Sequence, residues 1–157
     1  MNYLSKQNPA DFHGKRVLLR LDLNVPLDSE NRVADADADR VRKSLPTIEF
    51  LKNAGAKIII ISHLGRDPHE SLQSVAQYLD ELTTVGFVPE LFGDRAHGML
   101  SHLGMGHAIV LENLRSLPGE EANDPEFAEI AISVVDHQRF RRARSHVYRR
   151  LFHRHNQ

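Results

Sequence analysis

The 157-residue chain contains no cysteine, which excludes disulfides, cysteine-ligated zinc, iron–sulfur clusters and a thiol nucleophile. Long apolar runs are also missing. The longest of them, such as Ile58–Ile61, are far shorter than the ~20 residues that a membrane-spanning helix needs. Residues 1–11 are polar and do not resemble an apolar signal segment. We therefore expect a soluble, cytoplasmic protein that does not contact a membrane.

Acidic and basic residues are unevenly distributed, although the formal net charge is only −1. Residues 137–157 hold seven arginines, four histidines and no acid, whereas all 21 acids lie in residues 1–136. The length and the 41% apolar content suffice for one core of ordinary size, but not for two large domains. We expect one domain over residues 1–136, followed by a basic tail, residues 137–157, that is either disordered or not native to the protein that the domain comes from.

The apolar pattern predicts strands that alternate with helices. Four isoleucines at 58–61 place apolar side chains on both faces of a strand, which is typical of a parallel sheet covered on both sides. The predicted strands cover residues 16–21, 57–62, 87–89 and 108–111. The predicted helices cover residues 40–54, 71–82 and 94–102, with a further one from residue 124. The pattern indicates an α/β fold, a parallel sheet flanked by helices.

Two details of the predicted helices depend on single residues. Pro46 lies within the first helix, so we expect either a kink or a late start. Ser71 stands at the start of the second helix, where its hydroxyl can cap the first turn.

Cationic residues follow three of the predicted strands. Arg20 ends the first, His63 and Arg66 follow the second, and Arg115 follows the strand at 108–111. The carboxyl ends of parallel strands meet at one edge of the sheet, where ligands bind in such folds. A single arginine after a strand is more often a surface charge, but three cationic loops favour a site for a multiply charged anion.

The same loops resemble motifs of the phosphoglycerate kinase family. Arg20-Leu-Asp-Leu-Asn-Val-Pro26 resembles the signature RxDxNVP, and Ser62-His-Leu-Gly-Arg66 resembles SHLGRP. Arg40 precedes Leu45-Pro-Thr-Ile48 as in RIxxxLPTI, and Leu111-Glu-Asn-Leu-Arg115 resembles LENxR. The resemblance covers residues 12–134, most of that family's N-terminal domain.

This resemblance implies a Rossmann-like three-layer domain that binds phosphoglycerate. The family catalyses a glycolytic reaction, the transfer of a phosphoryl group between ATP and 3-phosphoglycerate, giving ADP and 1,3-bisphosphoglycerate. The implied contacts with the carboxylate and hydroxyl side of the substrate come from Arg20, Asp22 and Asn24. Arg40 would stabilise the migrating phosphoryl group, and the non-reacting phosphate would be held by His63, Arg66 and Arg115. Asp22 would orient Arg20, accept from the substrate hydroxyl, or act only as a structural partner of an arginine.

The sequence also departs from the family. Asp67 replaces the proline after SHLGR, and the later arginine of the family's HRAH segment has no match in register. The family's Mg-ATP or Mg-ADP binds in a C-terminal domain that these 157 residues do not contain, and no GxxxxGK[ST] or GxGxxG motif is present. We therefore expect a truncated fragment that carries the phosphoglycerate half-site, needs no cofactor of its own and is inactive in isolation.

Two other interpretations remain open. The arginine-rich tail could bind nucleic acid or another anion in a non-catalytic protein. The sequence contains no recognisable nucleic-acid-binding motif, so we do not expect nucleic acid as a partner. The chain could instead be a non-functional gene product, because residues 144–150 read one base further on can encode a string close to the family's. We expect a monomer or an aggregation-prone chain, with no metal site, since His97, His102 and His107 stand five apart and do not share a helix face.

Overall fold

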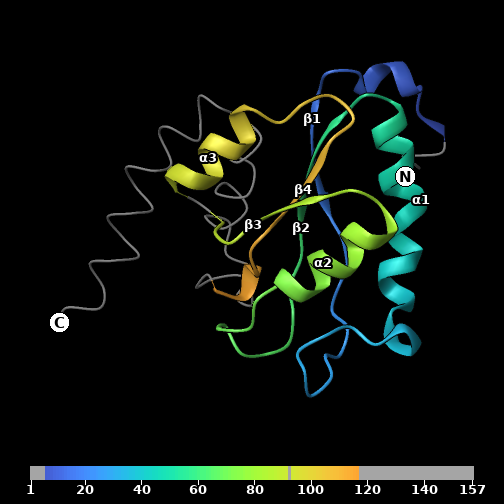
Figure 1. Ribbon diagram of the computed structural model, residues 1–157. Coiled ribbons are helices and arrows are strands. Elements are labelled where there is room, and N and C mark those ends of the chain that lie inside the picture. Colours follow the sequence, from blue (N-terminus) through green and yellow to red (C-terminus); the bar gives the residue numbers. More distant parts are fainter. Residues whose placement is uncertain (1–5, 92, 117–157) are drawn as a thin grey trace.

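A computed structural model describes residues 6–91 and 93–116, which form a parallel sheet with helices on both sides (Figure 1). The strands are β1 (Arg16–Arg20), β2 (Lys57–Ile61), β3 (Gly86–Val88) and β4 (Ala108–Leu111). They lie in the order β1-β2-β4-β3, and each neighbouring pair is parallel. The α-helices are α1 (Asp39–Asn53), α2 (Gln73–Leu82) and α3 (Asp94–Ser101). Short 3-10 turns are η2 (Pro9–Phe12), η3 (Asp35–Asp37) and η4 (Leu114–Ser116).

The strand order explains which helix covers which face. The connections through α1 and α2 both run across the sheet from β1 towards β3, whereas α3 returns from β3 to β4. Because such crossovers are right-handed, α1 and α2 must share one face and α3 must cover the other. Packing agrees: Ile58 and Ile60 join the cluster with α1 and α2, while Ile59 and Ile61 join the cluster with α3. The prediction of a three-layer α/β fold is confirmed.

In residues 6–91 and 93–116, the predicted strands and helices match the observed ones within one or two residues. The helix α1 begins at Asp39 and runs through Pro46, so the late start, one of the two alternatives predicted from Pro46, is wrong. The helix α2 begins two residues after Ser71, with Leu72 at the N-cap position. A side chain outside the helix stabilises its first turn, because Glu112 Oε1 accepts a hydrogen bond from the Leu72 backbone N–H at 2.9 Å. Ser71 Oγ accepts from Gln73 N–H at 3.1 Å, so it contributes one bond to this turn.

A polar turn at residues 28–32 closes a small hairpin. Leu27 and Val33 form an antiparallel bridge, and Asp28 Oδ1 accepts from the backbone N–H groups of Arg32 and Glu30, each at 2.9 Å. These bonds stabilise the carboxylate form, and the hydrogen bond from Arg32 contributes most to lowering the pKa of Asp28.

Some predictions concern residues that the structure does not describe. The helix predicted from residue 124 and the tail 137–157 both lie outside the described residues. Within the described part of the chain, no helix has the length and apolar character needed to cross a membrane.

The packing of α2 generates a stability prediction. Leu79 is fully buried between the helix and the sheet, whereas Leu82, three residues further on, is 42% exposed. We expect Leu79→Ala to lower the free energy of unfolding by about 2–5 kcal/mol, because it leaves a cavity in the core. The matched control Leu82→Ala should cost less than about 1 kcal/mol. Urea denaturation measures both, and equal losses would contradict the assigned face of α2.

Candidate anion-binding site

The candidate site lies where three loops leave the carboxyl ends of β1, β2 and β4. The strand pairing brings Arg20 beside Ile61, and Leu21 N–H still donates to Ile61 O at 3.1 Å after β1 ends. Leu114 N–H similarly donates to Ser62 O at 3.0 Å beyond the ends of β2 and β4. The three cationic loops are therefore adjacent, as the parallel pattern predicts.

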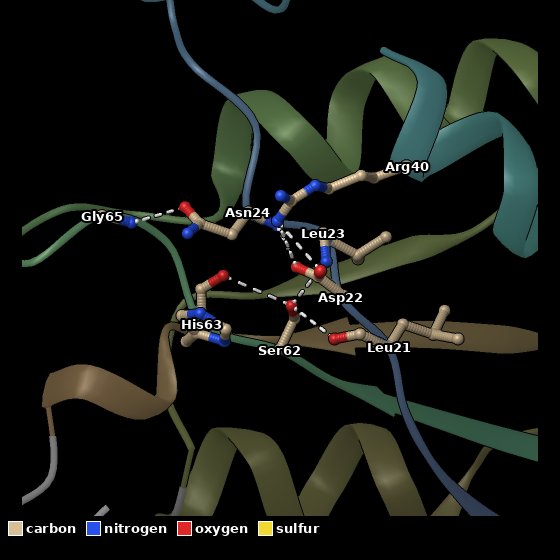
Figure 2. Close-up of polar contacts among 8 residues, drawn as sticks. All are labelled: Leu21, Asp22, Leu23, Asn24, Arg40, Ser62, His63 and Gly65. Atoms are coloured by element: carbon tan, nitrogen blue, oxygen red, sulfur yellow. Dashed lines mark hydrogen bonds and ion pairs between the residues drawn. The ribbon is translucent and has the colours of Figure 1, made fainter. Parts of the chain in front are cut away.

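Ser62 joins the loop after β1 to the end of β2. Its side chain is fully buried, and its Oγ accepts from Leu23 N–H at 3.0 Å and lies 2.8 Å from Leu21 O, to which it can donate (Figure 2). One hydroxyl thus replaces the sheet hydrogen bonds that β1 would otherwise make here. The result is a fixed backbone on which Asp22 and Asn24 are presented.

Asn24 connects the same loop to the glycine of the second one. Its Oδ1 accepts from Gly65 N–H at 3.0 Å (Figure 2). Gly65 has a φ of +59°, in the left-handed region that favours glycine. Asn24 was predicted as a substrate ligand, and its oxygen is occupied within the protein. Its Nδ2 amide is the group that can donate to an anion.

Asp22 and Arg40 are in direct contact. Arg40, in the first turn of α1, points its Nη1 at the carboxylate, 2.9 Å from Oδ2 and 3.1 Å from Oδ1 (Figure 2). The sequence left open whether Asp22 serves Arg20, the substrate or a structural pair, and the structure pairs it with Arg40. The two side chains are 59% and 56% exposed. An ion pair this exposed stabilises the fold by no more than about 1 kcal/mol, so Arg40 can exchange it for an anion at low cost.

The start of α1 is held by a second polar cluster. Arg42 donates from Nη1 to the carbonyl of Asp35 and from Nη2 to its carboxylate, both at 2.8 Å. Tyr78 of α2 donates its hydroxyl to the same carboxylate, and this hydrogen bond raises the pKa of Tyr78. The cluster attaches η3 to both helices, and it thereby fixes the point from which Arg40 extends.

A hollow of about 450 Å³ lies beside this cluster, between the hairpin and α2. Its lining includes Asp28, Arg32, Asp35 and Tyr78. Asp28 is paired with Arg32, and Asp35 is occupied by Arg42 and Tyr78. These groups already satisfy one another, so we do not regard the hollow as the functional site.

The loop after β4 contributes two polar residues to which the sequence assigned no role. Asn113 is fully buried and bonds to both its own loop and the loop after β2. Glu112 accepts from Ser71 Oγ at 2.9 Å and from Asn113 N–H at 2.8 Å. Together with Ser62, these residues are the ones that sequence reasoning missed. The available signal was a polar residue one or two positions after a strand that ends in four apolar residues.

The cationic side chains differ in burial. Arg20 and Arg66 are exposed at the edge, whereas His63 and Arg115 are partly buried. Guanidinium groups match carboxylate and phosphate oxygens in pairs, so this edge can hold a multiply charged anion. Residues 6–91 and 93–116 contain no group of three histidine or acidic side chains placed to hold a metal ion.

The fold and the site define a parallel α/β domain with cationic loops at the carboxyl edge of its sheet. Within that class, the chain belongs to the phosphoglycerate kinase family, whose model matches residues 7–138. A phosphoglycerate kinase from Synechococcus sp. (strain JA-3-3Ab) is 44% identical over 142 residues, covering 80% of this chain and 34% of that protein. The cytosolic phosphoglycerate kinase of Triticum aestivum is 42% identical over 133 residues, covering 81% of this chain and 33% of that protein.

Solved structures of the family have the same fold. Phosphoglycerate kinase from Pyrococcus horikoshii OT3 superposes with a TM-score of 0.68 at 34% identity, over 82% of this chain and 32% of that one. Phosphoglycerate kinase from Coxiella burnetii superposes with a TM-score of 0.68 at 31% identity, over 85% of this chain and 33% of that one. The chain therefore spans about a third of the length of the relatives that it matches, and the similarity lies in one part of the family's architecture.

The buried hydrogen bonds of Ser62 and the exposed ion pair of Asp22 should contribute differently to the free energy of unfolding. Ser62→Ala leaves the buried backbone groups of Leu21 and Leu23 without their partner, so we expect a loss of about 1–3 kcal/mol in the free energy of unfolding. Asp22→Asn breaks only an exposed ion pair and should cost less than about 1 kcal/mol. Urea denaturation at neutral pH compares them, and a larger loss for Asp22→Asn would refute the assignment of Ser62 as the structural element.

Proposed function

We propose that the carboxyl edge of the sheet binds the phosphoglycerate of the phosphoglycerate kinase reaction. In that reaction, a phosphoryl group passes from ATP to the carboxylate of 3-phosphoglycerate, leaving ADP and forming 1,3-bisphosphoglycerate. The observation that carries the proposal is the set of buried hydrogen bonds at Ser62 and Asn113, which fix three cationic loops beside one another. Such preorganisation suits an anion with charge at both ends.

The proposed roles divide the site between the two ends of the substrate. On the carboxylate and hydroxyl side we place Arg20, Asp22 and the Nδ2 amide of Asn24. On the non-reacting phosphate we place His63, Arg66 and Arg115. The arginine forks fit this division because carboxylate and phosphate each accept two parallel N–H bonds.

Arg40 is the proposed catalytic residue. As the phosphoryl group moves, the bond from phosphorus to the ADP oxygen breaks and a bond to the substrate carboxylate oxygen forms. Negative charge spreads over the migrating oxygens, and a nearby guanidinium stabilises it. The exposed pair with Asp22 holds Arg40 close to the β1 loop without binding it tightly. Asp22 then becomes free to accept a hydrogen bond from the substrate hydroxyl.

The magnesium nucleotide is proposed as the second substrate of the complete enzyme. In residues 1–157 we assign no side chain to it, and we propose that phosphoryl transfer requires sequence beyond this third of the family's length. The name of the wheat relative describes a cytosolic protein, which supports our proposal of a cytoplasmic location. The family match gives no support to a nucleic-acid-binding function for residues 137–157.

Binding of 3-phosphoglycerate tests the proposal directly. Because the site is open to water on one side, we expect it to bind 3-phosphoglycerate with a Kd of about 1 mM. Phosphorus NMR of the ligand measures this Kd. Arg66→Ala should raise Kd about tenfold, because it removes a charge-assisted pair of bonds to the phosphate. The control Lys15→Ala removes an exposed cation at the opposite edge of the sheet and should leave Kd unchanged. Equal affinity for Arg66→Ala and the unmodified chain would remove Arg66 from the site.

A second prediction concerns turnover by the 157-residue chain alone. We expect no conversion of 1,3-bisphosphoglycerate and ADP to ATP at rates approaching 1 s⁻¹, the low end of ordinary enzymes. The reason is that holding two substrates in line supplies roughly 7–11 kcal/mol of barrier reduction, which one substrate site cannot provide. A coupled assay of ATP formation measures this. Turnover of about 1 s⁻¹ or faster would show that the chain binds both substrates.

A further inference from the structure

The carboxamide of Asn113 makes four hydrogen bonds to main-chain groups of two loops. Its Oδ1 accepts from Leu64 N–H and from Arg115 N–H, each at 3.1 Å. Its Nδ2 donates to Leu64 O at 3.0 Å and to Glu70 O at 2.8 Å. The side chain has no exposed surface, and these bonds use its full hydrogen-bonding capacity.

These four contacts hold the segments that carry two of the cationic side chains. Leu64 and Glu70 lie on either side of Arg66, so one carboxamide closes the loop from which Arg66 projects. The backbone of Arg115 is bound to the same oxygen. Asn113 therefore links the backbone of the loop that carries Arg66 to the backbone of Arg115.

Asparagine at residue 113 has the two donors and two acceptor sites that the four backbone groups require. The orientation of the amide is settled by the network, since the reverse orientation would face two N–H donors with the NH₂ group. A carboxylate at residue 113 would lack the donors that Leu64 O and Glu70 O require. An alanine would leave all four backbone groups without this partner, and the two on Leu64 are buried.

We propose that Asn113 is a positioning residue that sets the separation between Arg66 and Arg115 for recognition of a phosphate group. This rests on the function proposed above for the same edge. Two guanidinium groups bind one phosphate well only when their spacing is fixed to within a fraction of an ångström. Asn113 acts on that spacing through the backbone, and it does not touch the ligand.

Ser62 provides a matched comparison within the same site. It is equally buried and also bonds side chain to backbone, but it holds the loop of Asp22 and Asn24. The two residues thus support different halves of the site. A purely structural effect would be the same for both, whereas a positioning effect on the phosphate would be specific to Asn113.

The test is a double-mutant cycle on the 157-residue chain, with 3-phosphoglycerate as the probe. Asn113→Ala should raise Kd about tenfold when Arg66 is present and less than about twofold when Arg66→Ala is already in place. Ser62→Ala should raise Kd by the same factor in both backgrounds. Each Kd is corrected for the folded fraction obtained from urea denaturation. Asn113→Ser, which keeps one hydroxyl at the position, replaces Asn113→Ala if the alanine variant does not fold.

The outcomes separate the two proposals. If the unmodified chain does not bind 3-phosphoglycerate at millimolar concentrations, the proposed function fails. If it binds, and substitution of Asn113 raises Kd by the same factor with and without Arg66→Ala, the positioning role alone is wrong. The same coupling to Arg66 for Ser62→Ala as for Asn113→Ala would also overturn it, because the effect would then be a general loosening of the edge.

Discussion

The candidate site depends on buried hydrogen bonds that begin where the sheet ends. Past the carboxyl ends of β1, β2 and β4, regular strand pairing ends, but backbone groups of the loops still need hydrogen-bond partners. Ser62 and Asn113 supply those partners from short polar side chains with no exposed surface. Because a buried unpaired group costs about 1–3 kcal/mol, the loops have one favourable arrangement instead of many.

This arrangement divides the polar residues of the edge into two groups. The first group consists of the buried residues Ser62 and Asn113 and the partly buried Glu112, which bond to the main chain and fix the loops. The second group provides charge, and within it Asp22 and Arg40 form an exposed ion pair. Charged side chains on fixed loops can rearrange around an anion at low cost, while the loops themselves stay in place.

The sequence predicted the fold closely because its signals are local and strong. Four consecutive isoleucines in β2 could be buried only in a sheet covered on both faces, and the alternation of strands and helices then required parallel pairing. The strand order follows less directly, because nothing in the sequence indicates that β4 inserts between β2 and β3. That insertion depends on packing between distant segments.

The candidate site likewise combines features that the local sequence shows with features that depend on contacts between distant segments. The motifs around Arg20, Arg66 and Arg115 were visible as cations after strands. The pairing of Asp22 with Arg40 could not be predicted, because it joins residues 18 apart from a loop and a helix. The roles of Ser62 and Asn113 depend on backbone groups up to 49 residues away, and a buried polar residue is distinguished from an exposed one only in three dimensions.

The most direct test of the account is an amide chemical-shift map of the isotopically labelled 157-residue chain during titration with 3-phosphoglycerate. The account predicts that the shifts concentrate at Asp22–Asn24, at His63–Arg66 and in η4. The amides of Gly14, Lys15 and Gly106, at the opposite edge of the sheet, should be unaffected. Shifts concentrated at that opposite edge, or spread evenly over the sheet, would contradict the assignment of the carboxyl edge as the anion site.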